Sequence, residues 1–248
     1  MTAIKFCGMT RVQDVVAAAE SGALYVGCVF AGGPRHRTTT EAAALFASLG
    51  GTASPLRVGV FAGMFAPATP DPTGPAGAAG IRDVAAAVPV DIAQVHGDAP
   101  APEVAALRTA LRAMHPSRKV WAVARCEGGR LPAGAAALWA AADALLLDAH
   151  VPGKLGGTGT TLPWRTMAAD LRELRAAAGP ESRLVLAGGL TPDNVGEAIL
   201  LLRPDVVDVS SGVERAPGIK DHDRMHAFAD AVRTADATIA SPTPSPIP

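Results

Sequence analysis

RLVLAGGLTPDNVGEAILLLRPDVVDVSSG, residues 183–212, contains the repeating unit of this chain in its clearest form. Its two ends, RLVLAG (183–188) and VVDVSS (206–211), are short apolar runs, which are typical of strands covered on both faces. The segment between them, TPDNVGEAILLLRP (191–204), has helical patterning and a proline in its first turn. Because a helix between two such strands is the usual parallel crossover, the stretch predicts one β-α-β unit.

The same unit recurs along the chain. Apolar runs of this kind occur eight times, at AIKF (3–6), LYVGCVF (24–30), LRVGVF (56–61), DIAQVH (91–96), KVWAV (119–123), ALLLDA (144–149), RLVLAG (183–188) and VVDVSS (206–211). Further segments with helical patterning lie between them, at TRVQDVVAAAESG (10–22), TEAAALFASLG (40–50) and APEVAALRTALRAMH (101–115). Eight units in 248 residues predict an α/β fold, a single (β/α)8 TIM barrel with a parallel eight-stranded core.

An open, doubly wound sheet is the main alternative fold. Against it, no G-x-G-x-x-G motif follows the first predicted strand, and eight strands fit closure without a spare element. We therefore expect a barrel domain over residues 1–234 and a proline-rich, disordered tail over 235–248. The segment AGMFAPATPDPTGPAGAAG (62–80), rich in proline and glycine, is interpreted as a long loop after the third strand.

Composition indicates an enzyme that acts on small molecules. The 22 basic and 23 acidic side chains nearly cancel, and no block of like charge would follow a nucleic-acid backbone or an anionic membrane. No apolar run approaches the roughly 20 residues that cross a bilayer, and MTAIKFC (1–7) lacks the pattern of an export signal. We expect a cytoplasmic protein with a small-molecule partner, and neither nucleic acid nor membrane.

The three cysteines, Cys7, Cys28 and Cys126, are an odd number without C-x-x-C spacing. They therefore indicate neither a disulfide framework nor a tetrahedral zinc site, and they fit a reducing compartment.

The predicted barrel places its chemistry at the carboxyl ends of the strands. Polar residues and glycines gather at those positions, among them Cys7, Arg35, Gln94, His96, Asp148 and Asp208. Three nearby segments, GKLGGTG (153–159), AGGLTPDN (187–194) and SSGVE (210–214), can offer backbone N–H groups to an anion. Since barrels often bind phosphate between the loops after strands seven and eight, a phosphorylated ligand is expected.

Taken in order, these motifs resemble the phosphoribosylanthranilate isomerase family. The matching elements are KFCGMTR (5–11), GCVF (27–30), PR (34–35), VGVF (58–61), QVHGD (94–98), LLLDA (145–149), GGTG (156–159), LAGGLTPDNV (186–195), DVSSGVE (208–214) and PGIKDHD (217–223). The resemblance implies an Amadori rearrangement of N-(5-phosphoribosyl)anthranilate to 1-(2-carboxyphenylamino)-1-deoxyribulose 5-phosphate in tryptophan biosynthesis. It also implies an intramolecular oxidoreductase of the aldose–ketose type that needs no cofactor and no metal. A monomer and a homodimer both remain open.

The resemblance implies that Cys7 is the general base and Asp148 the general acid of this reaction. A free thiol with a pKa near 8.5 is little ionised at neutral pH, so the site is expected to lower the pKa of Cys7 or to rely on the substrate. Strand alternation puts Lys5 on the same face as Cys7, which makes Lys5 a candidate for stabilising the thiolate.

Binding roles also follow from the resemblance. Arg35 matches the position that meets the anthranilate carboxylate, a task suited to a guanidinium fork, and we prefer it to Arg37. Lys5, Gln94 and His96 are expected to line the substrate site, and Asp208 to orient the substrate hydroxyls. Cys28 and Cys126 receive no role. The expected phosphate-binding residues are Gly157, Gly188, Gly189, Ser210, Ser211 and Gly212.

Two other functions fit the sequence less well. A related histidine-pathway phosphoribosyl isomerase is disfavoured because that family carries an aspartate where this chain has Cys7. A non-catalytic phosphosugar-binding barrel is disfavoured because such a protein has no physical reason to keep both Cys7 and Asp148. The chain departs from the family pattern in the long segment 62–80 and at Leu162 and Pro163, where an aromatic residue and a carboxylate commonly stand.

Overall fold

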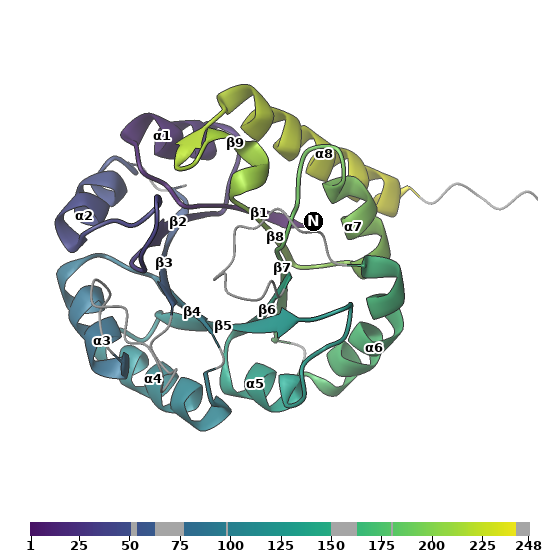
Figure 1. Ribbon diagram of the computed structural model, residues 1–248, viewed down its shortest axis with the longest axis horizontal. Helices are drawn as coiled ribbons and strands as arrows, with labels where there is room; N and C mark the ends of the chain where they lie inside the picture. Colours follow the sequence, from purple (N-terminus) through teal and green to yellow (C-terminus); the bar gives the residue numbers. More distant parts are fainter. Residues whose placement is uncertain (51–53, 63–76, 98, 150–162, 180, 242–248) are drawn as a thin grey trace, which may run out of the picture.

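A computed structural model describes residues 1–50, 54–62, 77–97, 99–149, 163–179 and 181–241. Within these ranges, eight parallel strands close into a barrel, with β8 paired to β1, and helices surround it (Figure 1). The strands are β1 (Ala3–Cys7), β2 (Tyr25–Val29), β3 (Leu56–Ala62), β4 (Ile92–His96), β5 (Lys119–Cys126), β6 (Ala144–Ala149), β7 (Arg183–Leu186) and β8 (Val206–Val209). The (β/α)8 fold predicted from the repeated β-α units is confirmed.

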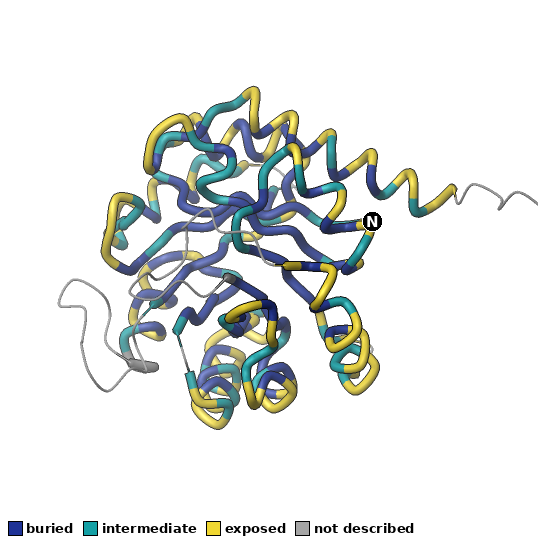
Figure 2. The backbone as a smooth tube through the Cα atoms, turned by 45° about the vertical axis from the view of Figure 1, so that its right-hand side comes forward, coloured by how far each residue is buried: buried dark blue, intermediate teal, exposed yellow. Residues whose placement is uncertain are grey.

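Each strand is followed by a helix. The helices are α1 (Val12–Glu20), α2 (Thr39–Ala47), α3 (Gly77–Ala87), α4 (Ala101–Met114), α5 (Ala135–Ala141), α6 (Trp164–Ala177), α7 (Val195–Leu202) and α8 (His222–Ala240). Figure 2 shows buried residues, in dark blue, along the strands and exposed residues, in yellow, on the outer sides of the helices. This pattern explains the apolar strands, since one face fills the barrel and the other packs against helices. No helix in the described ranges is both long enough and apolar enough to cross a membrane.

The two faces of each strand build two separate apolar clusters. Outward residues such as Phe6 pack against the helices, and inward residues such as Val58 and Leu146 fill the barrel. Near the amino ends of the strands, Tyr25 and Trp121 meet edge to face with ring centroids 4.9 Å apart. The barrel is therefore packed shut below the site, as the layered interior of this fold requires.

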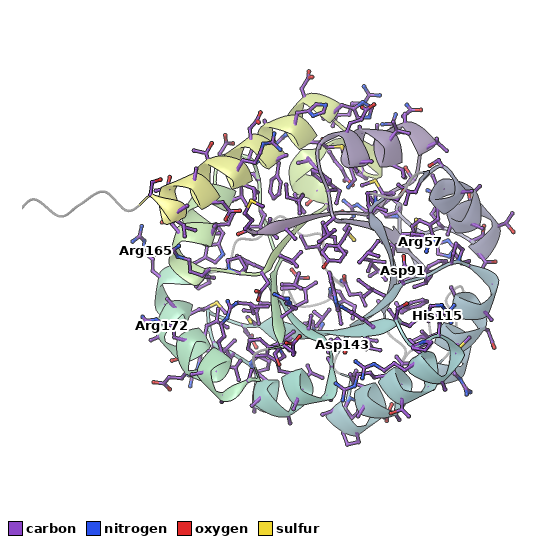
Figure 3. The ribbon with its side chains drawn as sticks, turned by 180° about the vertical axis from the view of Figure 1, so that it is seen from behind. Arg57, Asp91, His115, Asp143, Arg165 and Arg172 are labelled. Carbon is purple, nitrogen blue, oxygen red and sulfur yellow. The ribbon has the colours of Figure 1, made fainter. Side chains whose placement is uncertain are left out.

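Polar contacts join the amino ends of the strands, on the side of the barrel opposite their carboxyl ends. Arg57, near the start of β3, pairs with Asp91 just before β4, with 2.8 Å between Nε and Oδ2 (Figure 3). Asp143, just before β6, accepts a hydrogen bond of 2.8 Å from the backbone N–H of Val120. Polar residues at this end of a barrel serve stability, so we assign none of them to the site.

A small additional unit connects β8 to α8. It consists of the 3₁₀ turn η1 (Ser211–Val213) and the antiparallel strands β9 (Glu214–Ala216) and β10 (Ile219–Lys220). This hairpin was not predicted from the sequence, because its strands have three and two residues and show no alternation of apolar side chains.

The structure corrects two predicted boundaries. Helix α8 continues to Ala240, so residues 235–240 of the predicted tail are helical. The reason is that no proline interrupts the helix before 242, while Val232 and Ala235 keep burying its inner face. Helix α3 begins at Gly77, inside the predicted loop 62–80. The remainder of that loop, 63–76, and residues 242–248 lie outside the described residues.

Candidate active site

A cavity of about 300 Å³ opens at the carboxyl ends of the strands, where the sequence predicted the site. Of the predicted site residues, it is lined by Cys7, Arg35, Gln94, His96, Asp148, Gly188, Gly189, Asp208, Ser210, Ser211 and Gly212. Lys5 lies inside the barrel without lining the cavity, and Gly157 falls outside the described residues. The site thus draws side chains from β1, β4, β6 and β8, which are far apart in sequence.

A buried ion pair lies beside the thiol of Cys7. Lys5 Nζ donates to Asp208 Oδ2 at 2.8 Å across the β1–β8 seam, where the two residues are register partners. Burial works to lower the pKa of Lys5, but Asp208 and Cys7 raise it above its ordinary value. Burial also raises the pKa of Asp208, although Lys5 opposes this. In the described residues Asp208 Oδ1 has no hydrogen-bond partner, so it can accept one from a ligand hydroxyl.

Of the two alternatives expected for Cys7, a lowered pKa is not found, and reliance on the substrate stays an expectation. Burial raises the pKa of the thiol, Lys5 and Lys220 act to lower it, and Asp208 acts to raise it. Lys5 therefore has the predicted stabilising effect on the thiolate, but burial outweighs it, and the pKa of Cys7 stands above its ordinary value. Gly27 on β2 leaves space for these side chains, because a Cβ there would lie only 3.1 Å from Cys7 Sγ and 3.3 Å from Lys5 Nζ.

Asp148 and His96 meet within the cavity. His96 Nε2 lies 3.2 Å from Asp148 Oδ2, and both side chains are buried. This contact suits both protonation states of the carboxyl group, because Nε2 can donate to a carboxylate or accept from a carboxylic acid. In the described part of the chain, His96 Nδ1 and Gln94 Oε1 are buried without partners, so both remain available to a ligand.

The loops after β7 and β8 lie against each other. Gly188 and Gly189 have φ of 84° and 64°, the left-handed region that glycine adopts without strain. A Cβ at Gly212 would lie 1.8 Å from the carbonyl oxygen of Leu190, so only glycine allows this approach. Ser210 Oγ donates to the carbonyl of Cys7 at 3.1 Å and ties the same loop to β1. This arrangement fits the expected phosphate-binding loops.

Arg35 has a partner that the sequence analysis missed. Its Nε and Nη2 donate to Glu214 Oε1 and Oε2 at 2.9 and 2.7 Å, and Lys220 Nζ donates to the same carboxylate at 2.8 Å. Glu214 and Lys220 stood in the motifs DVSSGVE and PGIKDHD, but nothing in the sequence showed that the hairpin turns them toward Arg35. Their position inside those two motifs was the available signal.

Metal ligation finds no support in the described residues, where no group of three or more His, Cys, Asp or Glu side chains is arranged to hold an ion. The arrangement instead offers a thiol, a carboxyl group with a histidine beside it, a guanidinium and glycine-rich loops around one cavity. These groups can move protons on a bound anionic ligand.

Comparisons with known proteins agree with this chemistry. The family model described as N-(5'phosphoribosyl)anthranilate (PRA) isomerase matches residues 4–231. An N-(5'-phosphoribosyl)anthranilate isomerase of Thiobacillus denitrificans is 41% identical over 226 residues, which are 91% of this chain and 95% of that protein. The crystal structure of a phosphoribosyl anthranilate isomerase from Thermotoga maritima is 31% identical with a TM-score of 0.75, and the match covers 94% of this chain and 100% of the other.

A second solved structure contains a ligand. It is a phosphoribosyl anthranilate isomerase in complex with reduced 1-(o-carboxyphenylamino)-1-deoxyribulose 5-phosphate. This chain is 29% identical to it with a TM-score of 0.71, and the match covers 94% of this chain and 100% of that protein.

Proposed function

Because this chain belongs to the N-(5'-phosphoribosyl)anthranilate isomerase family, we propose that its cavity performs the reaction of that family with Cys7 as base and Asp148 as acid. The function is the isomerisation of N-(5-phosphoribosyl)anthranilate to 1-(2-carboxyphenylamino)-1-deoxyribulose 5-phosphate in tryptophan biosynthesis. The observation that carries the residue roles is the cavity itself, which is lined by both Cys7 from β1 and Asp148 from β6.

The first step opens the ribose ring. Asp148 donates a proton to the ring oxygen as the bond from that oxygen to C1′ breaks, and the nitrogen lone pair forms the C1′–N double bond of an iminium ion. His96, 3.2 Å from the Asp148 carboxyl, is placed to stabilise the carboxylate that remains. Asp148 is then an anion, and the substrate carries the proton it has lost.

The second step moves hydrogen from C2′ to C1′. The thiolate of Cys7 takes the proton from C2′, and the released electron pair forms a C1′–C2′ double bond while nitrogen recovers its lone pair. The resulting enol becomes a ketone when its hydroxyl proton returns to Asp148 and Cys7 returns a proton to C1′. C2′ is oxidised and C1′ is reduced within one molecule, so the reaction is an intramolecular oxidoreduction whose balance needs no cofactor.

The other groups of the cavity hold the substrate in this proposal. Asp208 Oδ1 and Gln94 Oε1 accept hydrogen bonds from ribose hydroxyls, which would supply the partners they lack within the described residues. The loops of Gly188, Gly189, Ser210, Ser211 and Gly212 receive the phosphate, together with Gly157. We place the reaction in the cytoplasm, which suits the free thiols of Cys7, Cys28 and Cys126.

The test is turnover of freshly generated N-(5-phosphoribosyl)anthranilate, followed by the change in its fluorescence. We expect Cys7→Ser and Asp148→Asn each to lose at least about a hundredfold in kcat, as removal of a general base or acid does. Cys28→Ser is the matched control, because Cys28 belongs to the outer apolar cluster and should keep activity within a few-fold. A folded wild-type protein without turnover would refute the isomerase function, and active Cys7 or Asp148 variants would refute those roles.

A further inference from the structure

The cluster of Arg35, Glu214 and Lys220 joins the loop after β2 to the hairpin β9–β10 at the edge of the cavity. We propose that Glu214 and Lys220 are positioning residues for recognition of the carboxylate on the substrate's aromatic ring. Glu214 binds one edge of the Arg35 guanidinium and leaves the other edge for the ligand. Lys220 keeps the cluster positively charged. The inference rests on the proposed function, because it takes Arg35 as the group that meets this carboxylate.

The hydrogen bonds show which edge of Arg35 is in use. A guanidinium can bind a carboxylate through the Nε and Nη2 edge or through the Nη1 and Nη2 edge. Glu214 takes the first edge, with bonds of 2.9 and 2.7 Å, and in the described residues Arg35 Nη1 donates to no acceptor. Because Arg35 also lines the cavity, its second edge can bind a ligand carboxylate while the first remains on Glu214.

Charge within the cluster favours an incoming anion. One carboxylate lies between two cations, and the side chains of Glu214 and Lys220 are 4% and 0% exposed. Burial would raise the pKa of Glu214, but Arg35 and Lys220 lower it below its ordinary value, so Glu214 stays ionised. Without Lys220, Glu214 would neutralise Arg35 completely. Burial lowers the pKa of Lys220 below its ordinary value, while the ion pair with Glu214 opposes this shift. A protonated Lys220 leaves one positive charge in a buried setting, where it attracts a carboxylate.

The cluster is held in place from two sides. Lys220 Nζ also donates to the carbonyl oxygen of Ser210 at 3.1 Å, and Ser210 Oγ donates to the carbonyl of Cys7. The backbone carbonyl of Lys220 accepts from Arg11 Nη2 at 3.2 Å, which fixes β10 beside α1. Gly8 leaves the space that Arg35 occupies, since a Cβ there would lie 2.5 Å from Arg35 Cδ. Glu214 is therefore a fixed anchor between the carboxylate-binding end of the site and the strand that carries the base.

The same contacts admit the opposite role, in which Glu214 imitates the substrate carboxylate and competes with it. The two roles predict opposite results for Glu214→Gln, which keeps the size of the side chain and removes its charge. Positioning predicts weaker recognition of the substrate carboxylate, because the guanidinium loses its ionic anchor. Competition predicts stronger recognition, because the Glu214 carboxylate no longer competes with the substrate carboxylate for Arg35.

The experiment compares two substrates, N-(5-phosphoribosyl)anthranilate and N-(5-phosphoribosyl)aniline, which lacks the carboxylate. We expect Glu214→Gln to lower kcat/KM about tenfold or more on the anthranilate substrate, mainly through KM, and to change it less than about threefold on the aniline substrate. Glu197→Gln is the matched control, because Glu197 pairs with Arg165 on the exposed surface and should change neither value. An equal loss on both substrates, or a lower KM for the anthranilate substrate, would overturn the proposal.

A double-mutant cycle shows whether Glu214 acts through Arg35. Arg35→Lys removes the fork, so adding Glu214→Gln to it should cost less than about twofold further on the anthranilate substrate. Full additivity of the two losses would overturn the proposal. If Glu214→Gln does not fold, Glu214→Asp replaces it, since the shorter carboxylate cannot hold Arg35 and Lys220 together. The ratio of kcat/KM on the anthranilate substrate to kcat/KM on the aniline substrate should fall several-fold in this variant. An unchanged ratio would contradict the proposal.

Binding measurements separate this inference from the proposed function. Calorimetric titration with reduced 1-(o-carboxyphenylamino)-1-deoxyribulose 5-phosphate, and with the same compound lacking its carboxyl group, gives the contribution of the carboxylate to affinity without any turnover. We expect that ratio of affinities to fall about tenfold or more in Glu214→Gln. If the ratio falls in Glu214→Gln as expected but the folded wild-type protein turns nothing over, the isomerase function is refuted and the positioning role is supported. An unchanged ratio would refute the positioning role even in an active enzyme.

Discussion

At the scale of single residues, the thiol of Cys7 lies beside two opposite charges. Lys5 acts to lower the pKa of the thiol and Asp208 acts to raise it, while burial keeps it above the ordinary value. Because the proposed base must be a thiolate, the rate should rise with pH until Cys7 is ionised. The Lys5–Asp208 pair then sets the pH at which the enzyme works, in addition to any contact with the substrate.

This arrangement predicts two pH shifts of opposite sign. Asp208→Asn removes an anion that disfavours the thiolate, so the rising limb of kcat/KM against pH should move to lower pH. Lys5→Met removes the cation that favours the thiolate, so the limb should move to higher pH. Measuring kcat/KM between about pH 6 and 10 gives the midpoint of the rising limb for each variant, even where the maximum rate is reduced. Shifts in the same direction would show that this pair does not control the ionisation of Cys7.

Two glycines in neighbouring segments offer a second prediction at this scale. A Cβ at Gly212 would lie 1.8 Å from a backbone oxygen, whereas a Cβ at Gly196 in α7 would meet nothing within 4 Å. Gly212→Ala must push the loops after β7 and β8 apart, so we expect KM to rise at least about tenfold through loss of phosphate contacts. Gly196→Ala should keep full activity and raise stability by about 0.5 kcal/mol. Equal kinetics for the two variants would argue against the phosphate site.

Much of the site could be predicted residue by residue, because the carboxyl ends of the strands are visible in the sequence. Cys7 directly follows an apolar run, His96 is the last residue of one, and Asp148 is the last but one of another. The structure brings all three to one cavity. Glu214 could not be found in this way. Its bond to Arg35 spans 179 positions and depends on a hairpin without any periodic pattern, so no local rule connects the two side chains.

At the scale of elements, the start of α2 is set by its own side chains. Thr38 accepts a hydrogen bond of 3.2 Å from the backbone N–H of Glu41, and Glu41 accepts one of 2.8 Å from the backbone N–H of Thr38. This capping box satisfies N–H groups that a helix start leaves without partners. It also ends the loop that carries Arg35, so it fixes the length of chain between β2 and the helix.

Loss of this cap should cost stability and little activity. We expect Thr38→Ala to lower the free energy of unfolding by about 1 kcal/mol, measured by urea denaturation. Thr38→Ser keeps the hydroxyl acceptor and should lie within a few tenths of a kcal/mol of the wild-type protein. If Thr38→Ser loses as much as Thr38→Ala, the methyl group rather than the cap would be responsible.

At the scale of the whole molecule, barrel closure was predicted from the number of β-α units, because eight strands fit a closed barrel without a spare element. The residue at which the domain ends could not be predicted from the number of units. Composition turns rich in proline only after Ser241, and the residues before it combine small and polar side chains that fit either a fraying end or a last helical turn. Tertiary contacts stabilise residues 235–240 as the end of α8. Ala235 is buried, and Asp236 accepts hydrogen bonds from Thr2, which precedes β1.

This contact between the two ends of the barrel sequence gives the last prediction. The carboxylate of Asp236 accepts from the N–H and the hydroxyl of Thr2 at 2.6 and 2.9 Å, beside the β1–β8 seam that closes the barrel. A chain ending at Thr234 loses both bonds and the buried Ala235, so its melting temperature should fall by roughly 5–10 °C. A chain ending at Ser241 keeps them and should melt with the full-length protein. Asp236→Ala should reproduce most of the loss at full length, whereas Asp230→Ala, on the exposed face of the same helix, should not. Equal melting temperatures for the chains ending at Thr234 and at Ser241 would mean that the seam is closed without the last residues of α8, and the barrel domain would then end at residue 234, as the sequence predicted.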